Sequence, residues 1–153
     1  MRKAAKVWLI AAAALVLLGG ILFAVVMAAL PWDFTKLSTV RYETNTYEIA
    51  ETFRSISITT DTADIVFARS DDGRCRVECC EEEKAEHSVT VENDTLVIEL
   101  ADTRSWRDYI GFRPGSPKIT VYLPDTEYDT LTVDEDTGDI DIPGNIAFRN
   151  IDC

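Results

Sequence analysis

Basic side chains are scarce in this sequence after its first thirty residues. The 153 residues contain 15 Lys and Arg against 27 Asp and Glu, which gives a formal net charge of −12. Three basic residues and no acidic residue lie in residues 1–30, so the remaining 123 residues carry 12 basic and 27 acidic side chains. Binding to nucleic-acid phosphates or to anionic lipid needs clustered Lys and Arg. The composition therefore argues against nucleic acid as a partner and against docking of the main domain on anionic lipid.

Histidine is nearly absent, which limits the catalytic sites that the chain can build. The single histidine, His87, follows a charged run at residues 81–86 that is typical of a solvated hairpin loop. A Ser or Cys nucleophile would need this histidine as its base, and no glycine-rich phosphate-binding loop is present. We therefore expect no catalytic residue, no cofactor and no enzymatic activity. A polysaccharide-acting enzyme built on paired carboxylates stays open as an alternative.

Cysteine is limited to four residues, namely Cys75, Cys79, Cys80 and Cys153. Cys75 and Cys79 lie four apart on one predicted strand, about 13 Å from each other, which is too far for a disulfide. The alternation of that strand makes them buried core thiols, and a disulfide that involves Cys80 is the alternative. Zinc is disfavoured because the sequence has neither a second C-x-x-C motif nor a histidine pair.

A long apolar run is the strongest single feature that the sequence does have. Residues 7–30 contain no charged residue, and as a helix they would span about 36 Å against a hydrocarbon core of about 30 Å. Trp32 suits the aromatic belt of a membrane interface. The alternative is a signal peptide cleaved after the small-x-small site at residues 26–28.

The charges that flank this run predict its orientation. Basic residues precede it, and the positive flank of a spanning helix stays in the cytoplasm. We therefore expect a single-pass protein of the cell membrane, with residues 1–6 cytoplasmic, residues 7–30 transmembrane and the C-terminal domain extracellular. Residues 31–51 are predicted to form a stalk, since they mix polar and charged residues with scattered apolar ones.

From residue 52 onward the apolar residues alternate with period two, which is typical of half-buried strands. Asn93-Asp94 lies between two such strands and suits a tight hairpin turn. No stretch after residue 52 sustains a helical period, so the domain at residues 52–153 is predicted to be all-β. The predicted strands lie at residues 55–59, 65–67, 74–79, 88–92, 95–100 and 118–122.

An internal repeat shows how these strands are arranged. Residues 56–67 align without gaps on residues 131–142, and both copies read strand, Asp-Thr-small-Asp, strand. The strand openings recur at residues 53–58, 128–133 and 148–153, the last two 20 residues apart. Short strands at such a period predict a β-solenoid, or β-roll, whose rungs bury their apolar faces by stacking.

The third copy ends at Cys153, within its first strand. An incomplete last rung would leave an exposed strand edge, which is prone to pairing. We therefore expect either a truncated member of a longer family or a partner over this edge, and self-association through it is a further prediction.

The order of these motifs resembles a known family. The motifs are Thr59-Thr60-Asp61-Thr62-Ala63-Asp64-Ile65, the hairpin at Asn93-Asp94, Lys118-Ile119-Thr120-Val121-Tyr122-Leu123-Pro124, and Thr137-Gly138-Asp139-Ile140. Together they resemble the "putative adhesin" β-solenoid domain of unknown function found in many Gram-positive bacteria. The resemblance implies a membrane helix followed by stacked rungs, a surface or envelope role, and no catalytic residues.

Aspartates recur at the predicted rung corners. Asp61 and Asp64 in the first copy correspond to Asp136 and Asp139 in the second. Such side chains cap backbone N–H groups in turns, and we expect that role here. The alternative is a calcium site built from Asp134, Asp136, Asp139 and Asp141, although their spacing fits neither the EF-hand loop nor the calcium-binding nonapeptide repeat.

The longest irregular connection, at residues 103–115, concentrates aromatic and arginine side chains. We expect its aromatics to cap the open end of the solenoid. In the alternative interpretation the loop recognises a protein or glycan ligand, because exposed Trp, Tyr and Arg dominate binding surfaces. The candidate partner-binding residues are Trp106, Arg107, Tyr109, Phe112 and Arg113.

These observations favour a non-catalytic, adhesin-like interaction module of the cell surface or envelope. An envelope-stress sensor, or an accessory subunit that works with a membrane partner, is the alternative.

Overall fold

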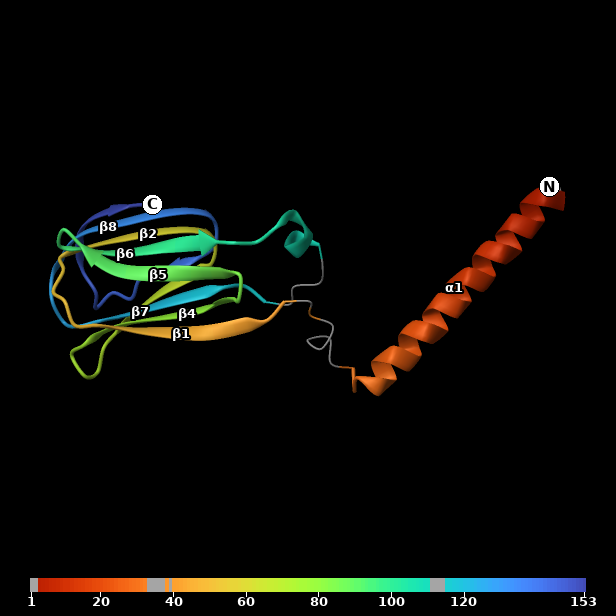
Figure 1. Ribbon diagram of the computed structural model, residues 1–153, viewed down its shortest axis with the longest axis horizontal. Helices are drawn as coiled ribbons and strands as arrows, with labels where there is room; N and C mark the ends of the chain where they lie inside the picture. Colours follow the sequence, from red (N-terminus) through yellow and green to blue (C-terminus); the bar gives the residue numbers. More distant parts are fainter. Residues whose placement is uncertain (1–2, 33–37, 39, 111–114) are drawn as a thin grey trace. The chain divides into compact units, whose positions relative to one another are not determined.

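The computed structural model describes residues 3–32, 38, 40–110 and 115–153. The chain divides into two units, Met1–Ser38 and Thr39–Cys153. In the first unit, helix α1 covers Lys3–Ala29 (Figure 1). Its stretch Ala5–Ala29 is long and apolar enough to cross a membrane, a test that a signal sequence near the N-terminus also passes.

The second unit is a curled sheet of short strands, which confirms the all-β, solenoid-like prediction. Its sheet runs in the order β10-β8-β2-β6-β5-β4-β7-β3-β9, with β1 added beside β4. The strands are β1 Tyr42–Ile49, β2 Ser55–Thr62, β3 Asp64–Arg69, β4 Cys75–Glu82, β5 Ala85–Glu92, β6 Thr95–Asp102, β7 Lys118–Leu123, β8 Tyr128–Thr137, β9 Ile140–Asp141 and β10 Phe148–Asp152, and a short 3-10 helix, η2, covers Trp106–Tyr109.

Parallel pairing stacks these strands into rungs. Strand β2 lies between β6 and β8, and β3 lies between β7 and β9. Ile56 faces Leu131, and Ile65 faces Ile140. The two residues of each pair are 75 positions apart in the sequence. The gapless alignment of residues 56–67 on residues 131–142 has the same offset, so it matches the residues that pair in the sheet. Strand β10 continues the stack, because Ile151 faces Leu131 in the β10–β8 pair.

Antiparallel strands close one side of this stack. Strand β5 returns along β6 through a turn at Asn93 and Asp94, whose φ angles of 48° and 64° are the left-handed conformation that Asn and Asp tolerate. Strand β4 pairs with both β5 and β7. The curled sheet is therefore part solenoid and part hairpin.

The sheet begins further upstream than the alternation in the sequence indicated. The prediction placed residues 31–51 in a stalk, but Tyr42–Ile49 form strand β1 and pair along the length of β4. The alternation of β1 is hard to see in the sequence because Asn45 occupies an inward position beside Tyr47 and Ile49. Asn45 is placed there by a hydrogen bond to the buried Glu81.

Aliphatic side chains from stacked rungs fill the interior. Ile56, Ile58, Leu96, Ile98 and Leu131 are each no more than 1% exposed, and burial of such a side chain contributes roughly 1.5–3 kcal/mol. Aromatic rings close one end of this core. The ring of Tyr128 lies 5.9 Å from that of Phe53 and 5.6 Å from that of Phe148, measured between centroids.

The corner between β2 and β3 stacks directly on the corner between β8 and β9. Ile65 N–H donates to the carbonyl of Asp139 at 2.8 Å, which links the two rungs. A Cβ added at Gly138 would overlap the backbone oxygen of Ala63. Glycine at this position is therefore what allows the two corners to lie in contact.

Candidate functional site

A third corner of the stack, the connection between β6 and β7, differs in length from the β2–β3 and β8–β9 corners. Paired residues are 40 positions apart in β2–β6 and 54 apart in β3–β7, so the β6–β7 connection is 14 residues longer than the β2–β3 corner. The connection leaves β6 at Asp102 and returns at Pro117, whose carbonyl accepts a hydrogen bond from Asp64 N–H. Of these extra residues the structure describes residues 103–110 and 115–116, most of which belong to the connection at residues 103–115 that is rich in aromatic and arginine side chains.

Arg104 anchors the base of this loop. Its side chain is only 8% exposed. Its guanidinium donates to Asp102 at 2.8–2.9 Å and to Asp61 at 3.3 Å, and lies 3.6 Å from Glu82. The hydrogen bonds from Arg104 hold the pKa of Asp102 well below its usual value. One buried cation thus links the loop to β2, β4 and β6.

Helix η2 is fixed by a second set of contacts. Ser105 N–H and Oγ both donate to the carboxylate of Asp108, at 2.8 and 2.9 Å. Lys84 Nζ lies 2.6 Å from Asp108, and this ion pair joins the loop to the β4–β5 turn. The hydrogen bonds from Lys84 and Ser105 lower the pKa of Asp108 to about 2. These contacts therefore hold η2 through Ser105, which precedes it, and through Asp108 within it.

Three large side chains in or next to η2 are nevertheless exposed, although the Tyr109 hydroxyl donates a hydrogen bond to Asp102 at 2.9 Å. Trp106 is 70% exposed, Tyr109 53% and Ile110 68%. The guanidinium of Arg107 lies over the Trp106 ring, 5.4 Å from its centroid, and that of Arg104 lies 4.9 Å from the centroid of Tyr109. We call Trp106, Arg107, Tyr109 and Ile110 the aromatic platform.

The expected capping of the core by this loop is corrected for Trp106 and Tyr109, whose rings lie outside the core. Phe112 and Arg113, the other two candidate partner-binding residues, lie outside the described residues.

Two small hollows lie under the loop. One of about 270 Å³ is lined by Thr60, His87, Arg104, Tyr109 and Pro117, among others. The other, of about 300 Å³, lies between the β4–β5 turn and the platform and reaches Val40, Arg41, Arg107 and Ile110. The loop thus bridges the corner of the solenoid and the start of β1.

The charged run before His87 is not the solvated loop that its composition indicated. Strand β4 extends to Glu82 and β5 begins at Ala85, so only Glu83 and Lys84 form the turn. Glu81 is 1% exposed and His87 is 3% exposed. The strand alternation that buries Cys75, Val77 and Cys79 also carries Glu81 into the interior, and that alternation was the available signal.

These buried groups form a complete hydrogen-bond network. The Nδ1 of His87 lies 2.6 Å from Glu81 Oε2, and its Nε2 lies 2.9 Å from Thr60 Oγ1. Asn45 Nδ2 donates to Glu81 Oε1 at 2.8 Å, and His87 N–H donates to Oε2 at 2.7 Å. Satisfied buried polar groups are compatible with a stable core. The geometry gives His87 a structural partner on each ring nitrogen.

The thiol of Cys79 lies beside this network. Ligand atoms of Cys79, Glu81 and His87 all lie within 4.8 Å of one another. Burial, together with the nearby Glu81 charge, raises the pKa of Cys79 to about 12, which disfavours the thiolate that a metal would need. Because both ring nitrogens and both carboxylate oxygens already have protein partners, the group fits a hydrogen-bonded core better than a metal site.

The four aspartates of the alternative calcium interpretation lie on the outside of the β8–β9 corner. Asp134, Asp136, Asp139 and Asp141 are all exposed. Among the described residues, the carboxylates of these four are not part of a group of three ligands that converges on one point.

The four aspartates expected to cap the corners have different surroundings. Asp64 Oδ1 lies 3.4 Å from Asp139 N, across the two stacked corners. Asp61 instead pairs with Arg104. Capping by Asp136 and Asp139 stays a prediction.

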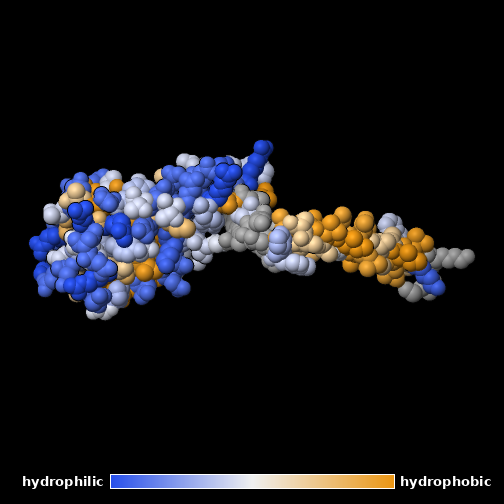
Figure 2. Space-filling model, turned by 90° about the horizontal axis from the view of Figure 1, so that it is seen from below, coloured by the Kyte–Doolittle hydropathy of each residue, from blue (hydrophilic) through white to orange (hydrophobic). Residues whose placement is uncertain are grey.

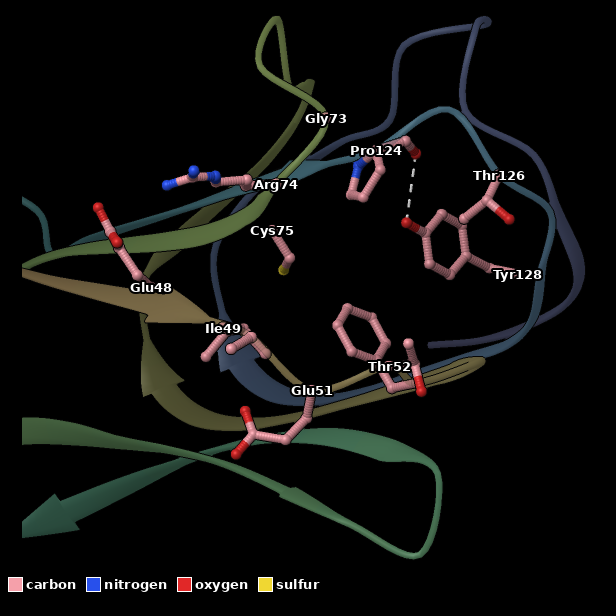
Figure 3. A pocket seen from close by; sticks show the side chains of 12 residues that line it. Glu48, Ile49, Glu51, Thr52, Gly73, Arg74, Cys75, Pro124, Thr126 and Tyr128 are labelled. Carbon is pink, nitrogen blue, oxygen red and sulfur yellow. Dashed lines mark hydrogen bonds between the residues drawn. The ribbon is translucent and has the colours of Figure 1, made fainter.

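A further hollow of the β unit lies at the end opposite to the start of β1. Its volume is about 530 Å³, and its lining includes Ile49, Phe53, Cys75, Pro124 and Tyr128. Figure 3 shows the thiol of Cys75 inside the hollow and the Tyr128 hydroxyl directed to the carbonyl of Pro124, a hydrogen bond of 3.3 Å. Burial raises the pKa of Cys75 to about 12, so this thiol is a weak nucleophile at neutral pH.

All four cysteines are free thiols in the structure. Cys75 and Cys79 are buried, as the alternation of β4 predicted. Cys80 is half-buried and Cys153 is exposed.

Comparison with known proteins supports this architecture. No curated protein matches the chain. Among solved structures, a putative adhesin from Bacteroides fragilis matches 68% of this chain and 44% of its own, at 21% identity and a TM-score of 0.51. A putative lipid binding protein from Parabacteroides distasonis matches 63% of this chain and 39% of its own, at 21% identity and a TM-score of 0.42.

The first likeness shows a shared fold. The chain spans less than half the length of these solved structures. The profile of the Toastrack DUF4097 family matches residues 53–153, which are the repeats and hairpins described above. With two thirds of its length matched, and with the motif order that resembles the adhesin-like domains, the chain belongs to the Toastrack DUF4097 family.

Proposed function

We propose that this chain is a membrane-anchored, extracytoplasmic interaction module that acts without catalysis through its aromatic platform. The observation that carries the proposal is the contrast at the third corner. A loop held by a buried arginine and two sets of carboxylate contacts exposes a tryptophan, a tyrosine and an isoleucine. Folded proteins gain nothing in stability from fixing a backbone in order to expose such side chains, and aromatic and arginine side chains are what binding surfaces use.

The anchor is supported by helix α1. Its 25-residue apolar stretch exceeds the length needed to cross a hydrocarbon core. The basic residues before it favour a cytoplasmic N-terminus and an outer β unit.

The absence of catalysis is supported by how the reactive groups are used. Within the described residues, His87 is the single histidine, and hydrogen bonds occupy both of its ring nitrogens in the interior. The thiols of Cys75 and Cys79 are buried, with pKa values raised to about 12. A nucleophile would need an accessible thiol or hydroxyl beside a free base.

The native cysteines provide a test of topology. We expect a membrane-impermeant maleimide, added to intact cells that express the Cys80→Ser variant of the full chain, to label the exposed Cys153 without permeabilisation. The buried thiols of Cys75 and Cys79 serve as internal controls because the maleimide cannot reach them in the folded unit, and Cys153→Ser in the same background should abolish labelling. The labelled chain should stay in the membrane fraction after alkaline washing.

Two results would contradict this proposal. Labelling of Cys153 only after the cells are permeabilised would place the β unit in the cytoplasm. A shortened, labelled chain in the medium would show that the N-terminal helix is a cleaved signal sequence.

A further inference from the structure

Exposed large apolar side chains of the β unit are concentrated in one place. Among its described residues they are Trp106, Tyr109, Ile110 and Ile151, and three of these four lie within five consecutive residues. On the face drawn in Figure 2 the β unit is mostly hydrophilic with scattered apolar spots, whereas α1 is largely apolar. The apolar part of the platform is therefore a local feature rather than a general property of the surface.

The platform lies at the end of the β unit where the chain arrives from the helix. Val40 and Arg41 line the same hollow of about 300 Å³ as Arg107 and Ile110. Glu83 N–H donates to the carbonyl of Arg41 at 3.2 Å, and the hydroxyl of Tyr42 donates to the carbonyl of Gly115 at 3.1 Å. Figure 1 shows η2 at the end of the unit where β1 begins.

The covalent connection keeps this end near the membrane. Ten residue steps separate Leu30, at the end of the apolar run, from Val40, and even a fully extended chain of that length spans at most about 35 Å. A tether of this reach converts a weak contact into an intramolecular one with a high effective concentration. The opposite end of β1, with the hollow around Cys75, has no such constraint.

We propose that the aromatic platform contacts the headgroup layer of the bilayer that α1 crosses. The inference rests on the proposed membrane anchor and names the partner of the platform. Tryptophan and tyrosine carry an apolar ring with a polar edge, and they favour the interface between hydrocarbon and water. Ile110 extends the apolar surface, and Arg107, whose guanidinium lies over the Trp106 ring, adds a cation that can reach the headgroup phosphates.

This contact does not need anionic lipid. Lys84 is paired with Asp108, and Glu82, Glu83 and Asp102 lie around the same loop. Local cations are thus balanced by local carboxylates, in a domain that is strongly acidic. The attraction comes from the rings and the aliphatic side chain, so it persists on a zwitterionic surface and at raised ionic strength.

Tryptophan fluorescence tests this contact on the full chain. The Trp8→Phe, Trp32→Phe double variant retains Trp106 as its only tryptophan and is reconstituted into phosphatidylcholine vesicles that carry bromine or nitroxide quenchers at shallow or deep acyl positions. We expect the shallow quencher to reduce Trp106 emission roughly twofold and the deep quencher to have a weaker effect. Raising the salt concentration should leave this quenching in place.

The matched control moves the reporter to the other end of the unit. In the same background, Trp106→Phe is combined with Thr126→Trp, because Thr126 is exposed beside the hollow around Cys75. We expect this reporter to remain unquenched. Equal quenching of both reporters would overturn the inference, since it would show that the domain lies on the surface without a preferred face.

The two proposals fail in distinguishable ways. If the full chain does not float with the vesicles, the membrane anchor is wrong and the platform contact falls with it. A third variant, Trp8→Phe with Trp106→Phe, retains Trp32 as its only tryptophan. If the chain floats and Trp32 is quenched in this variant, while Trp106 is not quenched in the Trp8→Phe, Trp32→Phe variant, the anchor stands and the lipid contact is overturned. The platform would then remain accessible to a protein or glycan in the aqueous phase. Quenching that disappears at high salt would also overturn the inference, because it would indicate adsorption by charge.

Discussion

The corners of the solenoid fall into two kinds: the tight β2–β3 and β8–β9 corners, and the long connection between β6 and β7. The corner after β2 turns within one residue and the corner after β8 within two, and the two corners lie so close that Gly138 has no room for a side chain. The corner after β6 occupies the equivalent place but holds 14 more residues, which leave the stack and return to it at Pro117. Close stacking of two corners fixes the rungs, and this leaves the third corner free to carry an inserted surface.

The largest effect is expected at the tight corner. Gly138→Ala would place a Cβ against the carbonyl of Ala63 and force the two rungs apart, so we expect a loss of roughly 3 kcal/mol in the free energy of unfolding. Gly144→Ala is the matched control, because nothing lies within 4 Å of the added atom. Urea unfolding of both variants measures the difference, and equal stabilities would show that the corners are not in contact.

A smaller effect is expected at the base of the inserted loop. Arg104→Ala removes the cation beside the buried Glu82 and the exposed Asp102, and we expect a loss of about 2 kcal/mol after allowing for the exposure of the Asp102 carboxylate. Arg107→Ala removes an exposed arginine from the same loop and should change the stability by less than about 0.5 kcal/mol. Thermal unfolding that ranks the two variants equally would contradict the anchoring role of Arg104.

The smallest expected effects have opposite signs at the two kinds of corner. The pKa of Asp102 is lowered by Arg104, so its contribution is present above the unfolded value near 3.8 and is lost as the pH falls through the folded pKa. The pKa of Glu135, at the tight corner, is raised above 4.5 by burial and by the nearby Asp139 and Asp64. The contribution of Glu135 is therefore present below the unfolded pKa and is lost as the pH rises through the folded one.

These signs can be read from two variants measured at several pH values. Asp102→Asn should be less stable than the parent at neutral pH by about 1 kcal/mol, and the difference should shrink toward pH 3. Glu135→Gln should be slightly more stable than the parent at neutral pH, by less than about 1 kcal/mol, with the difference vanishing in acid. A Glu135→Gln variant that is less stable at neutral pH would show that the ionised carboxylate has a favourable partner.

The stacking register could be predicted from the sequence because it repeats without gaps. Ile56 and Ile65 align on Leu131 and Ile140, and these are the residues that face each other in the sheet. The repeated alternation also located most strands and the hairpin turn at Asn93. Parallel stacking imposes the same pattern on each rung, which is why this part of the fold was accessible.

Features that depend on partners far along the chain were not accessible in the same way. A run of glutamates in the sequence indicates a solvent-exposed segment. Only the hydrogen bonds of Glu81 with Asn45 and His87, together with that of His87 with Thr60, show why Glu81 is buried. Strand β1 was missed for the same reason. The aromatic loop was recognised as exceptional, but the exposure of Trp106 and the burial of Arg104 depend on contacts with β2 and β4 that no local pattern indicates.

The central place of β2 has a consequence for how the chain folds. Its two neighbours, β6 and β8, come 40 and 75 positions later in the sequence, so β2 has no permanent partner until much of the domain has been synthesised. Pairing across such separations makes folding slow, on the order of milliseconds to seconds. In the meantime its row of isoleucines can pair with other chains, so the strand that holds the finished domain together is also its most vulnerable segment during biogenesis.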